Sequence, residues 1–262
     1  MNYARLLIKK IFNTSILLHI RNSIGFRPSI YSSFKNIKNG SSISDAFCWR
    51  TDQNFITTFK YTDIPKLFFD IKNSHVEIFI HSKNNILLKK LTINKLQLSN
   101  EIIIDKSFLD GLESYGSFYV FHKYKQNKND NDDFSINNRC YTAYSKNGNL
   151  KSFVHGNLPA FHNNGKDEHY FTDIVKNTVF KNQTYIIQNN FNEYDKTELF
   201  FINPTSQKIS ITVNFDKFYL DPHCSKLLHV KKTNKVCIRS NSYFIRPIVF
   251  NYKNNYYDVY HS

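Results

Sequence analysis

The 262-residue sequence contains little glycine and proline, with 7 and 6 residues, and it lacks the common nucleotide-binding motifs. Neither G-x-G-x-x-G nor a Walker loop occurs, so a nucleotide cofactor is disfavoured. The G-x-S-x-G elbow of serine hydrolases is also missing, because Ser114 in residues 111–117 has the wrong spacing. No paired acids can be assigned to glycoside hydrolysis. These absences leave no recognisable catalytic motif.

Cysteine is scarce as well, with four residues in the chain. None of them forms a C-x-x-C pair, which disfavours a zinc ribbon or a thioredoxin-type site. A disulfide scaffold is not indicated at this length and cysteine content. We therefore expect reduced, mostly buried thiols at Cys48, Cys140, Cys224 and Cys237.

No uncharged hydrophobic run approaches the roughly 20 residues that span a bilayer. Residues 3–20 instead predict a basic amphipathic helix, and residues 22–42 predict a linker rich in serine, asparagine and lysine. The first 44 residues carry seven cations and no acid. Three interpretations stay open for residues 3–20: peripheral attachment to an anionic membrane surface, a mitochondrial transit peptide, or a helix packed on the domain. No small-residue cleavage site follows, so a secretory signal is not expected.

The formal net charge of +14 raises nucleic acid as a partner. Lysine outnumbers arginine 28 to 7, however, whereas surfaces that read phosphates favour arginine. Alanine occurs only 4 times, while asparagine, isoleucine and phenylalanine are abundant, which is typical of an A+T-rich gene. Nucleic acid is therefore an unlikely partner and gives only the third hypothesis for function.

From residue 45 the sequence alternates apolar and polar residues and is rich in β-branched and aromatic side chains. A short helix is expected at residues 64–69, with Asp63 as its N-cap, and a polar loop at residues 126–138. The predicted strands are 46–50, 55–61, 75–81, 86–93, 101–105, 117–122, 184–189, 198–203, 209–215, 227–231, 236–240 and 246–252.

A faint repeat relates residues 76–91 to residues 198–213, and residues 115–124 to residues 242–252. Short strands with turns every eight to twelve residues are typical of immunoglobulin-like sandwiches. The sequence thus predicts a mostly β fold with two tandem immunoglobulin-like β-sandwich units, at residues 43–160 and 161–262, behind a basic N-terminal helix and linker at residues 1–42. Such paired units usually serve as binding modules.

Four short segments carry a resemblance to a known group of proteins: SDAFCWR (44–50), YGSFYVFH (115–122), SFVHGN (152–157) and DVYHS (258–262). They resemble an uncharacterised bacterial family associated with gene clusters for surface-polysaccharide biosynthesis. The resemblance implies a link to glycan production at the inner membrane. It assigns no activity and no catalytic residue.

Three of the ten histidines lie at the ends of predicted strands or loops: His122, His155 and His261, the last with Asp258 nearby. Three imidazoles suit zinc or non-haem iron if their donor atoms converge. They form the metal-site hypothesis, in which a divalent metal is the cofactor. The alternative is that each is an exposed or singly hydrogen-bonded histidine.

Ligand binding has its own candidates, namely Arg50, His155 and Asn157. Gly156 lets the backbone approach a ligand closely, and Asn157 can adopt a left-handed turn or donate its amide. Alternation places Trp49 in the core and Arg50 outward, where it could meet an anionic sugar or phosphate. A plain turn and a solvated arginine are the simpler alternatives.

The leading hypothesis is a non-enzymatic or accessory binding protein of surface-glycan assembly. Its partners would be glycans or glycan-assembly proteins, and residues 3–20 would hold it on the cytoplasmic face of the inner membrane. A mitochondrial location is the alternative. A metal-dependent enzyme that uses His122, His155 and His261 is the second hypothesis.

Overall fold

The computed structural model describes residues 41–124, 135–138, 140–163, 171–173, 182–188, 190–203, 205, 207–242 and 245–262, together with residues 11, 14, 16, 17 and 20. The predicted helix at 3–20 and the linker at 22–42 therefore lie almost entirely outside the described residues. Most of the predicted loop at 126–138 does too, and its last four residues form a strand, β7. Within the described part of the chain, no helix has the length and hydropathy needed to cross a membrane.

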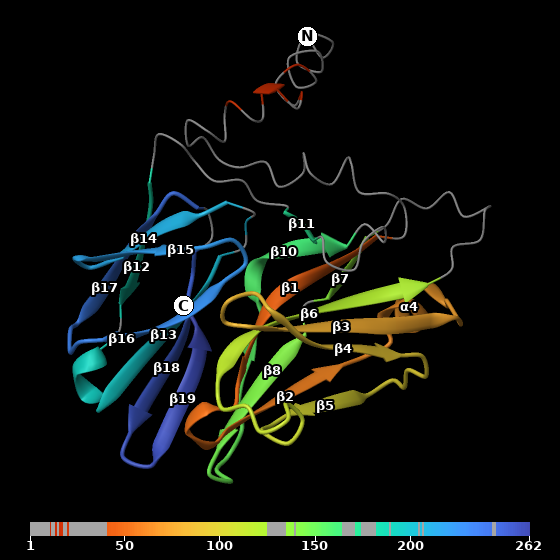
Figure 1. The fold of residues 1–262 in the computed structure, drawn as a ribbon, viewed down its shortest axis with the longest axis horizontal. Coiled ribbons are helices and arrows are strands. Elements are labelled where there is room, and N and C mark those ends of the chain that lie inside the picture. Colours follow the sequence, from red (N-terminus) through yellow and green to blue (C-terminus); the bar gives the residue numbers. More distant parts are fainter. Residues whose placement is uncertain are drawn as a thin grey trace.

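The strands of the described residues form four sheets, named blades I to IV here, and all pair antiparallel except β1 with β7 (Figure 1). Blade I contains β1 (Ser41–Arg50), β3 (Ser74–Ser82), β4 (Leu87–Ile93) and β6 (Tyr115–Tyr124), extended by β7 (Ser135–Asn138), β10 (Asn157–Asn163) and β11 (Phe171–Asp173). Blade II contains β2 (Phe55–Tyr61), β5 (Asn100–Ile104), β8 (Tyr141–Lys146) and β9 (Ser152–His155). Blade III contains β13 (Lys196–Ile202), β16 (Ser225–Val230), β18 (Ile248–Lys253) and β19 (Tyr256–His261). Blade IV contains β12 (Gln183–Gln188), β14 (Ile209–Val213), β15 (Asp216–Leu220) and β17 (Lys235–Ser240). Short helices are η1 (Asp52–Asn54), α4 (Ile64–Phe69) and η2 (Phe191–Glu193).

The prediction of two tandem immunoglobulin-like sandwiches is wrong, because the small antiparallel sheets are arranged as the four blades of a β-propeller. Each blade packs face to face on the next. One apolar cluster joins blade IV to blade III, a second joins blade III to blades I and II, and a third joins blade I to blade II. The two middle blades are thus buried on both faces, whereas each sheet of a sandwich has a solvated face.

β13 shows why alternation alone misled the prediction. Its residues Phe200 and Ile202 pack toward blade I, while Leu199 and Phe201 pack toward blade IV. All four side chains are buried, so the run LFFI is apolar without interruption. Strands covered on both faces read as continuous hydrophobic runs.

The faint internal repeat does not correspond to a structural repeat. Its first copy forms the hairpin β3–β4 within blade I. The matching second copy is divided between two blades, because β13 pairs with β16 and β18 while β14 pairs with β15 and β17. Hydrophobic alternation in the two segments is sufficient to explain their similarity.

Local structure follows the sequence more closely. The predicted helix is confirmed as α4, whose N-cap Asp63 accepts a hydrogen bond from the Lys66 backbone N–H at 3.1 Å. β2 has the predicted bounds, β4 and β17 differ from theirs by one residue at one end, and β3 and β12 differ by one residue at each end. The four cysteines are free, as expected, and Cys48 and Cys140 are buried.

Candidate functional site

A buried charge network lies where blades I, II and III meet. Its centre is Arg50, the last residue of β1, whose side chain is fully buried. The guanidinium donates from Nε and Nη2 to the two carboxylate oxygens of Asp52, at 2.9 and 2.7 Å. Its Nη1 donates to Glu198 Oε2 and to Tyr252 Oη, both at 2.9 Å. One arginine thus links the first three blades across long sequence separations.

Aromatic rings and a lysine complete this network. The Arg50 guanidinium carbon lies 4.4 Å from the Phe55 ring centre and 4.7 Å from the Phe250 ring centre. Tyr252 donates its hydroxyl to Glu198 Oε2 at 2.6 Å, and Lys196 Nζ lies 2.6 Å from Glu198 Oε1. Stacking of a cation between aromatic faces stabilises it where water is excluded.

The network shifts the pKa values of its members. Burial alone would raise the pKa of Glu198, but the charge of Arg50 and hydrogen bonds from Lys196, Tyr252 and Arg50 lower it to about 2. Burial raises the pKa of the Tyr252 hydroxyl. Burial and the charges of Arg50 and Lys196 lower the pKa of Lys146, which lies over the Tyr252 ring at 5.0 Å. Glu198 is therefore an anion throughout the neutral range.

Arg50 was expected to face outward, and that expectation is wrong. Cys48 and Arg50 do share one face of β1, as alternation requires, but that face packs on blade III and is not solvated. Its side chain is fully buried and four of its five N–H groups bind Asp52, Glu198 and Tyr252, so Arg50 is not accessible to a ligand in this structure. Trp49 is buried as predicted and donates its indole N–H to the carbonyl of His81.

His155 and His261 are brought together, at the seam between blades II and III. Their rings stack with centres 4.6 Å apart. Each Nδ1 lies near a backbone oxygen, that of Gly156 at 3.0 Å for His155 and that of Ser262 at 3.1 Å for His261. The Nε2 atom of His261 is buried and finds no hydrogen-bond partner within the described part of the chain. Burial, with the charges of His155 and Arg246, lowers the pKa of His261 to about 4, so its imidazole is neutral at pH 7.

The structure does not place the third histidine with this pair. His122 lies in β6 of blade I, opposite Val76, and its Nε2 is 2.9 Å from the carbonyl oxygen of Thr62, the residue after β2. No group of three histidine, cysteine or acidic side chains suited to a metal occurs among the described residues. Asp258 does not complete the pair either, because it lies three residues from His261 along β19 and so faces the other side of the sheet.

Asn157, the remaining predicted ligand residue, begins β10, where its backbone pairs with Ala46 of β1. Gly156 beside it is a place of close packing, since a Cβ there would lie 2.6 Å from Asp45 Cβ. The missing side chain of Gly156 thus allows β1 to pack closely on the chain between β9 and β10, and it does not open a space for a ligand.

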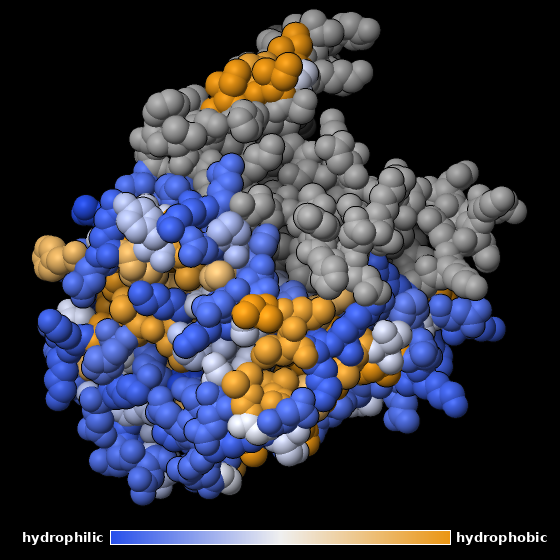
Figure 2. All heavy atoms as spheres, viewed as in Figure 1, coloured by the Kyte–Doolittle hydropathy of each residue, from blue (hydrophilic) through white to orange (hydrophobic). Residues whose placement is uncertain are grey.

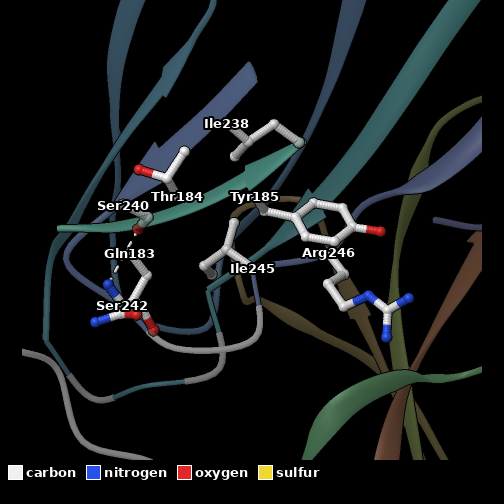
Figure 3. A pocket seen from close by; sticks show the side chains of 8 residues that line it. All are labelled: Gln183, Thr184, Tyr185, Ile238, Ser240, Ser242, Ile245 and Arg246. Carbon is white, nitrogen blue, oxygen red and sulfur yellow. Dashed lines mark hydrogen bonds between the residues drawn. The ribbon is translucent and has the colours of Figure 1, made fainter. Parts of the chain in front are cut away.

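A hollow of about 220 Å³ lies between β12, β17 and the segment that leads into β18 (Figure 3). Its lining combines one aromatic ring, two aliphatic side chains and several polar groups: Gln183, Thr184, Tyr185, Ile238, Ser240, Ser242, Ile245 and Arg246. Gln183 Nε2 is buried and has no hydrogen-bond partner among the residues that the structure describes. The hollow therefore contains a donor that its own walls do not satisfy.

Arg246 connects the hollow to the histidine pair. Its guanidinium carbon lies 5.2 Å from the Tyr185 ring centre, and in Figure 3 it extends along one side of that ring. Ser262, next to His261, donates its backbone N–H and hydroxyl to the carbonyl of Pro247, the neighbour of Arg246. Arg246 is exposed and forms no ion pair within the described residues. It is therefore a cation available to a ligand.

The sequence analysis missed Glu198, Tyr252, Arg246 and Tyr185. One sequence feature could have identified Glu198. It is the only acid in its predicted strand and is followed by the apolar run LFFI, and an acid in such a place is typically buried with a partner. Comparison with known proteins adds nothing further, because the chain matches no family model, no curated protein and no solved structure.

Proposed function

We propose that the protein is a non-enzymatic binding protein that holds a small anionic ligand, one acidic sugar unit of a glycan, in the hollow beside Arg246. The observation that carries this proposal is the exposed guanidinium of Arg246, which has no ion-pair partner in the part of the chain that the structure describes and lies next to the Tyr185 ring at the hollow. Guanidinium groups bind carboxylates with two parallel hydrogen bonds, and this geometry favours them over neutral groups.

The size of the hollow supports a small ligand. Pockets for drug-sized molecules measure roughly 300 to 1,000 Å³. At about 220 Å³ the hollow is smaller than that range. Its volume is suited to a single ring with short substituents. A longer glycan would place one unit here and extend into solvent.

The lining supports a polyhydroxylated ligand. Gln183 offers a buried amide donor that has no partner, and Thr184, Ser240 and Ser242 add hydroxyl groups along the same walls. Tyr185 offers an aromatic face for the C–H side of a sugar ring. Because unpaired buried donors cost free energy, a ligand oxygen at Gln183 would stabilise the complex. The resemblance to proteins of polysaccharide gene clusters points to the same class of ligand.

Calorimetric titration of the protein with glucuronate, galacturonate and glucose would test the proposal. We expect an acidic sugar to bind and glucose to bind at least about tenfold more weakly, since it lacks the carboxylate for Arg246. Arg246→Gln should remove that preference.

Arg239→Gln is the matched control. Arg239 lies in β17 between Ile238 and Ser240, and it points to the opposite face because side chains alternate along a strand. Equal affinity for acidic and neutral sugars, or an equal loss in both variants, would contradict the assignment.

A further inference from the structure

Two hairpin turns are joined at the end of the molecule that is lowest in Figure 1, where β8 turns into β9 and β18 turns into β19. The side-chain amide of Asn149 donates to the carbonyl of Asn255 at 2.9 Å. The Tyr257 hydroxyl bonds to the carbonyl of Leu150 at 2.7 Å. Ser152 adds a third link, accepting from the Val259 N–H at 3.0 Å. The two turns therefore form one fixed protrusion.

Each turn presents a large apolar side chain to solvent. Leu150 is 93% exposed, and Tyr256 is 76% exposed. Single exposed apolar residues are common on soluble proteins. Here two of them lie on turns that are hydrogen-bonded to each other, and neither contributes to a core. Figure 2 also shows apolar side chains gathered over the sheets, near β8, β2 and β4.

The protrusion is also rich in cations. Lys146 and Lys151 flank the turn from β8 to β9, and Lys253 begins the turn from β18 to β19. None of these three lysines forms an ion pair among the described residues. The charges of Arg50, Lys196, Glu198 and Asp52 all act on Lys146, so the two exposed lysines Lys151 and Lys253 supply the net charge of the tips. The two turns themselves, residues 146–151 and 253–256, contain no acid. The acids beside them are Asp258 in β19 and Asp195, whose carboxylate accepts from the Asn254 backbone N–H. Positive charge therefore exceeds negative charge at the tips.

We propose that the joined turns dock on an anionic lipid bilayer, with Leu150 and Tyr256 entering the interfacial layer and Lys151 and Lys253 contacting the headgroups. Leucine and tyrosine are side chains that partition into this layer, and tyrosine is enriched there. Lysines close to the surface are attracted by the negative potential of anionic lipids. The combination of exposed apolar side chains with lysines and no acid in either turn is complementary to the apolar interior and anionic headgroups of such a bilayer. The inference is independent of the sugar site and of any contact by residues 3–20.

Co-sedimentation of the full-length chain with vesicles tests this surface. The vesicles are phosphatidylcholine with 30% phosphatidylserine, and pure phosphatidylcholine is the comparison. We expect the double variant Leu150→Ser with Tyr256→Ser to partition at least about tenfold more weakly. Lys151→Gln with Lys253→Gln should lose roughly an order of magnitude on the anionic vesicles only.

Two control variants match these changes on other surfaces. Phe215, on the turn between β14 and β15, is 99% exposed, so Phe215→Ser removes an equally exposed apolar side chain. Lys231→Gln with Lys232→Gln removes two exposed lysines elsewhere. Both controls should bind like the unaltered protein. Unchanged vesicle binding by the tip variants would overturn the inference, and this is the result expected if residues 3–20 carry all attachment. An equal loss of binding in the control variants would overturn it as well.

A fluorescence measurement reports insertion directly. Leu150→Trp places a tryptophan at the tip, whereas the native Trp49 is fully buried and should not respond to lipid. Anionic vesicles should shift the emission of the new tryptophan to the blue, and brominated lipid should quench it. Phe215→Trp is the control and should show neither change. Absence of a shift in Leu150→Trp at saturating vesicles would also overturn the inference.

Discussion

Replacing Glu198 by glutamine should destabilise the protein in a strongly pH-dependent way. The carboxylate accepts hydrogen bonds from Arg50 and Tyr252 and lies 2.6 Å from Lys196 Nζ. Glutamine keeps the shape of the side chain but removes its negative charge from a buried site. The variant therefore isolates the electrostatic contribution of Glu198 from the packing of blade III.

The pKa of Glu198 sets the magnitude. A fall from the ordinary value of 4.5 to about 2 corresponds to about 3.4 kcal/mol at about 1.36 kcal/mol per pKa unit. Part of the carboxylate is solvated, so screening reduces this figure, and we expect about 2 to 3 kcal/mol at pH 7.

The sign of the pH dependence follows from the lowered pKa in the folded state. Above about pH 4.5 the group is ionised in both states, and the full stabilisation is present. Between pH 4.5 and about 2 the unfolded chain takes up the proton first, so the stabilisation is lost as pH falls. The difference between the native protein and Glu198→Gln should therefore shrink toward zero near pH 2.

Urea unfolding at pH 7 and pH 3, followed by the fluorescence of the buried Trp49, measures this difference. Glu101→Gln is the control, because the Lys60–Glu101 pair is half exposed, at 3.4 Å, and should contribute less than about 1 kcal/mol. A loss at pH 7 no larger than that of the control, or an equal loss at both pH values, would show that the network does not stabilise blade III as argued.

Two further predictions concern single residues. Gly116→Ala should cost about 3 kcal/mol or more in urea unfolding, because its Cβ would lie 2.1 Å from the His81 carbonyl oxygen that accepts the Trp49 indole N–H. Gly148→Ala, where φ is +76° and no atom lies within 4 Å, should cost only about 1 to 2 kcal/mol, and equal costs would contradict this account. His261→Gln should flatten the loss of thermal stability between pH 6.5 and about 4, since the unfolded chain binds the proton that the folded imidazole, with its pKa of about 4, does not. Melting temperatures that fall equally in variant and native protein over this range would exclude that role for His261.

Strand positions could be predicted from sequence because each strand depends on local chemistry. β2 and α4 have the predicted bounds, and Asp63 caps α4 as its position indicated. The predicted strand 209–215 is shorter in the structure, since Asn214 adopts φ +55° and turns the chain into β15. β8, β9 and β19 were not predicted, because their polar and aromatic residues alternate over only four to six positions.

The arrangement of the sheets, unlike the strand positions, could not be predicted from the sequence. Whether a strand is covered on one face or two depends on partners far away in the chain, as Phe200 and Phe201 show by packing into different clusters. The pairing of His155 with His261 has the same origin, because β9 and β19 meet only when blades II and III are assembled. Arg50 was placed on the correct side of β1, but its environment is set by Glu198 and Tyr252 of blade III.

The Arg50 network also has a kinetic consequence. Its bonds join residues 148 and 202 positions apart, so they form only after the chain has closed a very long loop. Contacts at such separations are typical of slow folding. During synthesis Arg50 would have Asp52 as its partner for as long as Glu198 is untranslated. The first three blades are therefore expected to reach their final packing late, and fragments that end before β13 should retain an incompletely paired guanidinium at their centre.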